Sequence, residues 1–397
     1  APGGPAGVPE GIEELLIGLT RGRPLGPVAR LRTRRRGRRV RENGAPVADV
    51  VVDLVTALDA SRSIGTFAEI EVELLNGAVD ALPRIAQVLR RAGARRGDDR
   101  PKLLRVVTFD EPELLPLPDE SDHLRAMIAA QYHALLAHDS GTRVGANAEA
   151  LHGFRVATRR LRAVLRAVEG MVEPAWAETL RAELKWLADG LGPVRDLDVL
   201  IAHVETGRSD LEHDDRSASG ELIAKLVAER ADARRELLAT LRSERYIRLL
   251  DALEEAACMP RLVASDLSLG EIAAGEFRRL RKAAGKLAPD LSDEDLHRLR
   301  IKAKRARYAA ELAQPVAGKR AARFVKRAKR FQDLVGEHQD AVVAADRIRS
   351  LVDKRKPRVA FAAGRLVERQ RVRREEARTK LPNAWRKLER AGRRAWA

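Results

Sequence analysis

Two separated stretches of this chain carry the same pattern of histidine and basic residues. Residues 151–164 read LHGFRVATRRLRAV, and residues 296–309 read LHRLRIKAKRARYA. His152 and His297 are equivalent, which sets a constant offset of 145 residues (297 minus 152) between the copies. Repetition of this kind predicts two similar supersecondary units rather than unrelated segments.

The spacing of the basic residues predicts that each copy is an α-helix with one cationic face. At 100° per residue, they fall within an arc of roughly 80° in the first copy. Apolar residues such as Phe154, Leu161 and Leu165 occupy the neighbouring arc, which indicates a packing face. The cationic residues are His152, Arg155, Arg159, Arg162 and Arg166 in the first copy, and His297, Arg300, Lys304 and Arg307 in the second.

A second landmark follows each copy at nearly the same distance. Residues 191–199 read LGPVRDLDV, and residues 334–342 read LVGEHQDAV. We expect the glycines to end helices, and we expect a polar loop at 205–220. Asp196, Asp198 and Asp340 would then either cap the next helices or orient the arginines of the cationic faces.

Taken together, the two motifs resemble the CHAD family, the conserved-histidine α-helical domain, over about residues 119–397. The resemblance implies two similar four-helix bundles with pseudo-twofold symmetry, at about 119–258 and 259–397. It also implies that a basic groove binds inorganic polyphosphate and that the CHAD-like domain is not an enzyme. The residues expected to bind polyphosphate are His152, Arg155, Arg159, Arg162, Arg166, Lys185, His297, Arg300, Lys304, Arg307, Arg323, Lys326, Lys329 and Arg330.

The first hundred residues follow a different, strand-like period. Arg30, Arg32 and Arg34 would share one face of a strand, and Glu42-Asn43-Gly44 is typical of a hairpin turn. Further strands are predicted at 47–55, 66–74 and 102–108, with helices at 11–19 and 78–92. Glu69, Glu71 and Glu73 alternate onto one face, where they are either solvated or hold a divalent cation.

The runs VARLRTRRR, GAPVADVVVDLV, TFAEIEVELLNG and PKLLRVV, within about residues 9–108, resemble the CYTH family of triphosphate tunnel metalloenzymes. That resemblance implies an antiparallel barrel that binds tripolyphosphate or a nucleoside triphosphate with Mg²⁺ or Mn²⁺. It assigns phosphate binding to Arg30, Arg32 and Lys102, and metal binding to Asp53, Glu69 and Glu71.

The Glu-x-Glu-x-Lys strand with which the CYTH family begins is not found in this sequence. We therefore expect an N-terminally incomplete α+β barrel domain, whose first strands either precede Ala1 or have been lost. Inorganic triphosphatase activity is left open for this domain. The predicted organisation is multi-domain and mainly α: residues 1–108 form the CYTH-like domain, 109–118 an acidic, proline-containing linker, and 119–397 the CHAD-like domain.

The net charge of +17 points to a polyanionic partner. A nucleic-acid-binding module is the main alternative, but aromatic residues for base stacking make up only 4% of the chain. The single cysteine, Cys258, excludes an internal disulfide and fits a reducing cytoplasm, where association with polyphosphate granules is expected. We expect no membrane span, because no apolar run approaches roughly 18 residues. The oligomeric state is not indicated.

Overall fold

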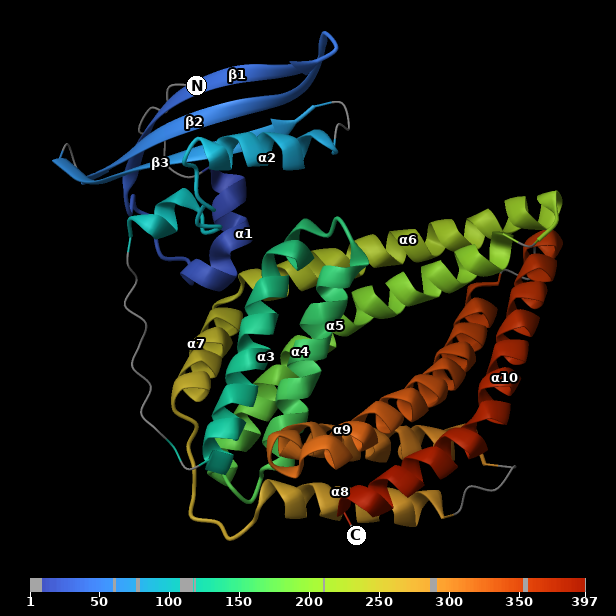
Figure 1. Cartoon of the computed structure of the whole chain (residues 1–397). Helices are drawn as coiled ribbons and strands as arrows, with labels where there is room; N and C mark the ends of the chain where they lie inside the picture. Colours follow the sequence, from blue (N-terminus) through green and yellow to red (C-terminus); the bar gives the residue numbers. More distant parts are fainter. Residues whose placement is uncertain are drawn as a thin grey trace. The chain divides into compact units, whose positions relative to one another are not determined.

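The computed structural model describes residues 9–59, 62–75, 79–107, 117, 119–209, 211–285, 291–352 and 356–396. The described chain is mainly helical with a small antiparallel sheet near its start, as predicted. It divides into a sheet unit, Pro24–Leu114, and a helical unit that combines Ala1–Arg23 with Leu115–Ala397 (Figure 1).

Three strands form the sheet unit's antiparallel meander: β1 (Arg30–Glu42), β2 (Ala45–Asp59) and β3 (Arg62–Leu74). The predicted hairpin is confirmed, because Asn43 and Gly44 have φ angles of 51° and 83°, the left-handed pair that a tight turn needs. Among the described residues the sheet has these three strands, so closure into a barrel stays a prediction.

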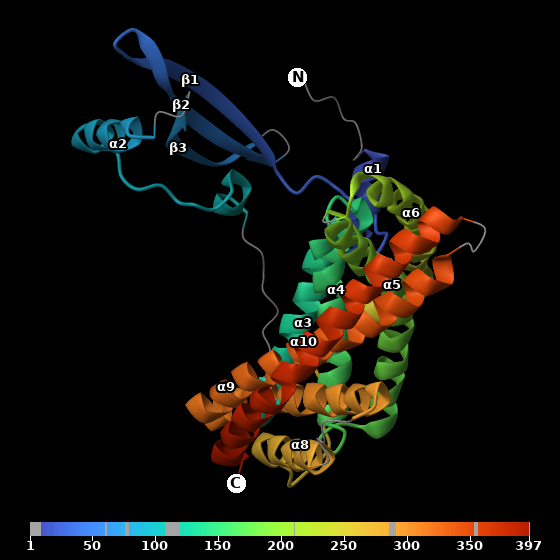
Figure 2. The same ribbon diagram turned by 90° about the vertical axis from the view of Figure 1, so that its right-hand side faces the viewer.

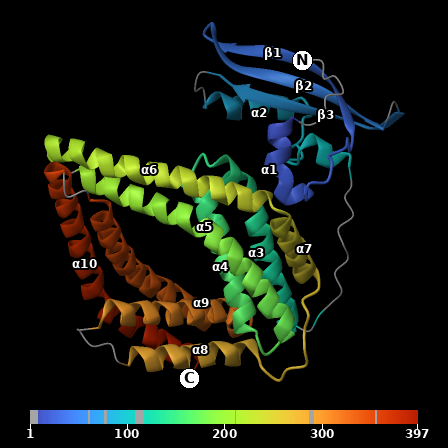
Figure 3. The same cartoon turned by 180° about the vertical axis from the view of Figure 1, so that it is seen from behind.

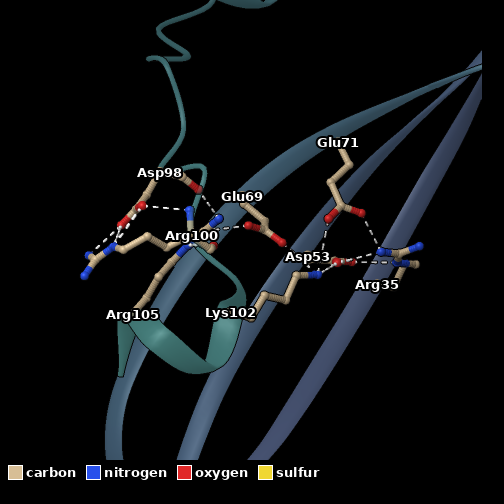
Figure 4. Close-up of polar contacts among 8 residues, drawn as sticks. All are labelled: Arg35, Asp53, Glu69, Glu71, Asp98, Arg100, Lys102 and Arg105. Carbon is tan, nitrogen blue, oxygen red and sulfur yellow. Dashed lines mark hydrogen bonds and ion pairs between the residues drawn. The ribbon is translucent and has the colours of Figure 1, made fainter. Parts of the chain in front are cut away.

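After the sheet come α2 (Ala81–Arg91), which was predicted, and a short 3-10 helix, η1 (Lys102–Arg105). The strand predicted at 102–108 is therefore wrong. Pro101 immediately precedes η1, and its fixed φ and missing N–H suit the start of a helical turn better than a sheet ladder. η1 carries Lys102 and Arg105 toward the acidic face of the sheet (Figure 4).

The helical unit contains both copies of the repeat. The predicted first half, residues 119–258, holds α3 to α7, and the described part of the second half holds α8, the two segments of α9, and α10 (Figure 3). Gly318, with φ 63° and ψ −145°, divides α9 into residues 293–317 and 319–351. The bounds are α1 (Glu10–Thr20), α3 (Asp119–Val144), α4 (Ala148–Ala167), α5 (Pro174–Ser209), α6 (His213–Arg242), α7 (Glu244–Cys258), α8 (Leu269–Ala284), α9 (Asp293–Leu351) and α10 (Pro357–Trp396).

Three apolar cores hold these helices together. One core joins α3, α4, the first half of α5, the end of α6 and α7, and it also takes in the start of α8 and part of α9's first segment; Phe154 and Tyr246 are fully buried in it. A second joins α8, α9 and the end of α10 around Phe324 and Phe331. The third joins the far ends of α5, α6, α9 and α10 (Figure 1). The predicted pseudo-twofold relation between the halves stays a prediction.

Helix α5 does not end at the glycines, contrary to expectation. It runs through Gly190, Gly192 and Pro193 to Ser209, and α6 begins at His213, so the predicted loop at 205–220 is also wrong. A proline inside a helix costs about 3 kcal/mol. The packing of Leu187, Leu191 and Val194 into the first core continues on both sides of Pro193 and offsets this cost.

Helix α1 packs within the helical unit, although the predicted boundary placed it in the N-terminal domain. Arg21, at the end of α1, donates to the Tyr132 hydroxyl on α3 and pairs with Asp251 and Glu254 on α7, both at 3.1 Å. In the part of the chain that the structure describes, no helix is both long and apolar enough to cross a bilayer.

Candidate functional site

A groove of about 700 Å³ lies among α4, α5 and α9, where the two repeat copies meet. Its lining includes residues of both predicted cationic faces, so these faces share one groove. From α4 come His152, Arg155 and Arg159, and from α9 come His297 and Arg300. His152, Arg155 and Arg159 lie on one face of α4 because of their helical spacing. The Asn147 side chain caps the start of this helix.

Arg155 is held in place by helix α5. Its Nη1 donates to the carbonyl oxygen of Gly192 (3.1 Å), and its Nη2 pairs with Asp196 Oδ1 (3.1 Å). A side-chain carbon at Gly192 would lie only 3.2 Å from that Nη1, so glycine permits the close approach. In the second copy, Arg300 also lies beside Gly336, but a side-chain carbon there would meet it only at 3.6 Å, an ordinary contact. Gly192 therefore accommodates an arginine, and neither Gly192 nor Gly336 ends a helix.

The acidic residues after these glycines were predicted either to cap helices or to orient arginines. Asp196, Asp198 and Asp340 all lie inside helices, so capping is wrong. Asp196 orients Arg155, and Asp198 pairs with Arg230 of α6. Asp196 and Asp340 both line the groove. Partial burial raises the pKa of Asp196 above its usual value; the charge of Arg155 opposes this, and the charge of Asp340 adds to it.

The cations of the two copies are close enough to repel one another. Burial, and after it the charges of Arg300, Arg159 and Arg155, lower the pKa of Lys304 to about 7. Burial likewise lowers the pKa of Arg300, whose buried Nε has no hydrogen-bond partner among the described residues. Arg159 uses its Nε to donate to the Tyr308 hydroxyl (3.0 Å), which leaves its terminal nitrogens toward the groove.

Several groove residues were not predicted as binding residues: Arg195 and His203 on α5, and Arg347 on α9. The prediction ended α5 at the glycines. A helix predicted to continue through Gly192 would have placed Asp196 and His203, seven residues apart, on one face. Burial lowers the pKa of both His152 and His203, and neighbouring arginines add to this. The described residues that line the groove carry no hydroxyl or thiol side chain.

The remaining predicted residues of α4, α5 and the first segment of α9 are not among the groove's lining residues. Arg162 and Arg166 lie further along α4. Arg307 is buried, pairs with Glu311 (3.5 Å) and covers the Tyr308 ring. Lys185 is exposed and pairs with Asp189 (2.8 Å).

The predicted cations in the second segment of α9 lie on a separate surface. Arg323 and Arg330 line cavities between α9 and α10, whereas Lys326 and Lys329 are exposed on α9. The sequence analysis assigned all four to polyphosphate binding together with the two cationic faces, but they lie beyond the kink at Gly318 and do not line the groove.

The sheet unit contains a second cluster, built around the fully buried Asp53 on β2 (Figure 4). Asp53 accepts two hydrogen bonds from Arg35 on β1, both at 2.8 Å, and one from Lys102 on η1. Lys102 also pairs with Glu69 (2.7 Å) and Glu71 (3.5 Å) of β3. The hydrogen bonds from Arg35 and then from Lys102 hold the pKa of Asp53 well below its usual range.

The predicted metal ligands are brought together here. Ligand atoms of Asp53, Glu69 and Glu71 lie within 4.8 Å of one another. The predicted phosphate ligand Lys102 lies among them, and its pKa is raised, first by its hydrogen bond to Asp53. Arg105, which was not predicted, pairs with Glu69 (2.6 Å).

Arg30 and Arg32 lie on the opposite face of the sheet from this cluster. A register shift between Val40 and Arg41 pairs Arg35, rather than Arg34, with Asp53. Because a shift of one residue exchanges the two faces of a strand, the even-numbered arginines point away from the carboxylates. The bulge leaves no strong trace in the sequence, so Arg35 was missed.

Comparisons with known proteins agree with the helical unit. The CHAD domain family model matches residues 126–349, which is more than half of the chain. The proteins Rv2226 and MT2285 from two strains of Mycobacterium tuberculosis, both named uncharacterized, are each 32% identical to this chain. The matches cover 98% of this chain and 80% of each relative.

Two solved structures share the fold. PptA from Streptomyces chartreusis is matched with a TM-score of 0.56 and 24% identity, over 67% of this chain and 98% of that one. The CHAD domain from the plant Ricinus communis is matched with a TM-score of 0.54 and 24% identity, over 70% of this chain and 94% of that one. With the matching family model, this likeness shows that the chain belongs to the CHAD domain family.

Proposed function

We propose that the helical unit binds inorganic polyphosphate in the groove between its two halves. The observation that carries the proposal is the convergence of Arg155, Arg159 and Arg300 from the two repeat copies in the lining of one groove. Lys304 is not a lining residue, but it lies close enough to feel the charges of all three arginines. These cations are partly desolvated and repel one another, which destabilises the free protein. A polyanion in the groove would neutralise them and turn this cost into binding free energy.

The chemistry of the groove suits a phosphate chain better than a nucleic acid. Arginine remains charged at any relevant pH and binds phosphate oxygens through two parallel hydrogen bonds. Single-stranded nucleic acids are usually held by aromatic side chains that stack on bases. No aromatic side chain other than the imidazoles of His152, His203 and His297 is among the described lining residues.

A binding assay on the full chain tests the groove. We would compare the double variant Arg159→Gln/Lys304→Gln with the control Arg235→Gln/Arg371→Gln, using fluorescently labelled polyphosphate at physiological salt. The control side chains are 73% and 64% exposed and pair with Asp232 and Glu368. Each charge-assisted contact is worth about 1.5–3 kcal/mol, so the groove variant should lose at least about tenfold in affinity.

Two outcomes would overturn this proposal. Equal losses in the groove and control variants would mean that general charge binds the polymer. Preferential displacement of polyphosphate by DNA, at matched phosphate concentration and physiological salt, would make the groove a nucleic-acid site. Affinity should also fall steeply with salt through counterion release.

The convergence of three carboxylates supports a second function, in the sheet unit. Asp53, Glu69 and Glu71 supply the hard oxygen ligands that Mg²⁺ and Mn²⁺ prefer, and they fit such an ion in number and spacing. Bound there, the metal would neutralise phosphate oxygens of a tripolyphosphate or a nucleoside triphosphate. Lys102 and Arg35, now paired with these carboxylates, would be released toward the same phosphates.

Manganese binding by the full chain tests this second proposal. We would titrate Mn²⁺ in calorimetry against the protein and against Glu69→Gln/Glu71→Gln, with Glu42→Gln, on the same sheet but outside the cluster, as control. Loss of binding in the double variant alone is expected, and equal binding in all three proteins would refute the site. Release of phosphate from tripolyphosphate that depends on Glu69 and Glu71 would establish triphosphatase activity.

A further inference from the structure

Helices α9 and α10 form a second strongly basic surface, separate from the groove. The two helices pack along each other in the second half of the helical unit (Figure 2). Two cavities, of about 270 and 480 Å³, lie between them. We call this surface the α9–α10 seam. Its basic residues are Arg320, Arg323, Arg327, Arg330, Lys380, Lys387, Arg393 and Arg394.

The two cavities follow one another along the same pair of helices. Arg320 and Arg323 share the larger cavity with residues 391–394 of α10. Arg327 and Arg330, one to two turns further along α9, share the smaller cavity with residues 379–387. The numbering rises on α9 while it falls on α10, as expected for antiparallel neighbours. The seam is therefore one track about 15 Å long, at 1.5 Å per residue over the ten steps from 320 to 330.

Among the described residues, seven of the eight seam cations lack the ion pairs that neutralise several other exposed arginines of this chain. Arg235 pairs with Asp232 and Arg371 with Glu368, each one helical turn away and both at 2.8 Å. In the seam, Arg393 pairs with Glu389 (2.8 Å). For the other seven cations the described residues supply no ion-pair partner. The seam therefore concentrates positive charge that no carboxylate among its described lining residues offsets.

This arrangement carries a cost in the free protein. On the second segment of α9, Lys319, Arg320, Arg323, Lys326, Arg327 and Arg330 lie within an arc of about 120° at 100° per residue. Like charges three and four residues apart each destabilise a helix slightly. No carboxylate occurs between residues 319 and 330 to offset them. An anion bound along the seam would remove this repulsion.

The lining of the seam indicates which anion fits. Besides the cations, it offers the hydroxyl of Thr379 and the amide of Asn383, both able to donate to phosphate oxygens. None of the described lining residues is aromatic, so there is no platform for bases, and none is acidic, so nothing would repel a continuous chain of phosphates. A linear condensed phosphate matches these features.

We propose that the α9–α10 seam is a second binding site for condensed phosphate chains and acts independently of the groove. The inference shares its ligand class with the proposed function, but it stands on different residues, because seam and groove have no lining residue in common. A long polymer that engages both sites would bind far more tightly than a short one through effective concentration.

Site-resolved labelling of arginines in the full chain tests the seam. Phenylglyoxal modification would be mapped by mass spectrometry with and without tripolyphosphate or medium-chain polyphosphate, at physiological salt. We expect protection at Arg323 and Arg327 as well as at Arg155 and Arg159, while the exposed, ion-paired Arg235 stays reactive. Protection in the seam should persist in the groove variant Arg159→Gln/Lys304→Gln.

The seam variant Arg323→Gln/Arg327→Gln/Lys387→Gln is the reciprocal test, and its exposed substitutions leave the core intact. It should lose about tenfold in affinity for medium-chain polyphosphate while Arg155 and Arg159 remain protected. Unchanged affinity, or reactive seam arginines in the wild type, would overturn the inference and leave the groove standing. If the seam variant loses all polyphosphate binding while the groove variant loses no affinity, the proposed groove site is overturned instead. If the seam variant loses DNA binding but keeps polyphosphate binding, the seam is a nucleic-acid surface and the inference is wrong.

Discussion

Replacing Lys304 by methionine tests the electrostatics of the groove most directly. Methionine keeps the length of the side chain and removes the charge, and therefore the repulsion from Arg155, Arg159 and Arg300. Lys304 ionises at about pH 7 in the folded protein, against 10.5 for an ordinary lysine. The unfolded chain therefore binds more protons between these two values, and the free energy of unfolding rises with pH across that window.

The size of the effect follows from this shift in pKa. Below about pH 7 the charged Lys304 destabilises the folded protein by the full amount, and above about pH 10.5 the effect vanishes. Linkage gives a gain of about 3 kcal/mol in wild-type stability between pH 6 and pH 9. Solvent screening reduces the gain to on the order of 2 kcal/mol, because Lys304 is only partly buried. Lys304→Met should lack this gain and be more stable than the wild type at pH 6.

Urea unfolding of both proteins at pH 6 and pH 9, followed by circular dichroism, measures this difference. Lys329→Met, an exposed substitution on the same helix, is the matched control and should track the wild type at both pH values. The reasoning is refuted if the gap between Lys304→Met and the wild type is the same at both pH values. A variant that is less stable than the wild type at pH 6 would refute it as well.

Three further predictions concern packing and the sheet. Gly336→Ala should stabilise the protein by up to about 1 kcal/mol in urea unfolding, because the added carbon meets the neighbouring guanidinium only at 3.6 Å and a helix favours alanine. Gly392→Ala should destabilise it by about 1–3 kcal/mol in the same assay, because its side chain would overlap the Phe277 ring. Asp53→Asn should flatten the acid dependence of hydrogen exchange in β2. The lowered pKa of Asp53, due first to Arg35, contributes stability above about pH 4 that is lost as pH falls.

Most of what could be predicted about the groove came from the sequence repeat at 151–164 and 296–309. Residues at i, i+3 and i+7 of a helix share a face whatever surrounds them, so Arg155 and Arg159 were placed together correctly. The same periodicity also put Arg323 and Arg330 on one face, but it could not show that this face lies apart from the groove, beyond the kink at Gly318. Whether a glycine ends a helix or makes room for a neighbour depends on tertiary packing, which explains the wrong helix end predicted at Gly192.

In the sheet unit, the register of β1 against β2 could not be predicted from the sequence. Alternation correctly placed Glu69 and Glu71 on one face of β3. Which arginines of β1 would face them depended on the bulge between Val40 and Arg41, one extra residue that reverses the assignment. Because β1 carries arginines at both odd and even positions, its sequence fits either register.

The packing of α1 has a consequence for how the two units are connected. Since α1 belongs to the helical unit, the sheet unit is an insertion within that unit's sequence and is not an appendage at its end. One peptide-bond cleavage on either side of the sheet unit would leave it covalently attached by the other connection. The contacts of Arg21 with Tyr132 and Asp251 join residues more than a hundred positions apart, so the chain must close a long loop before α1 can dock. We therefore expect α1 to dock late in folding, after the helices that receive it have formed.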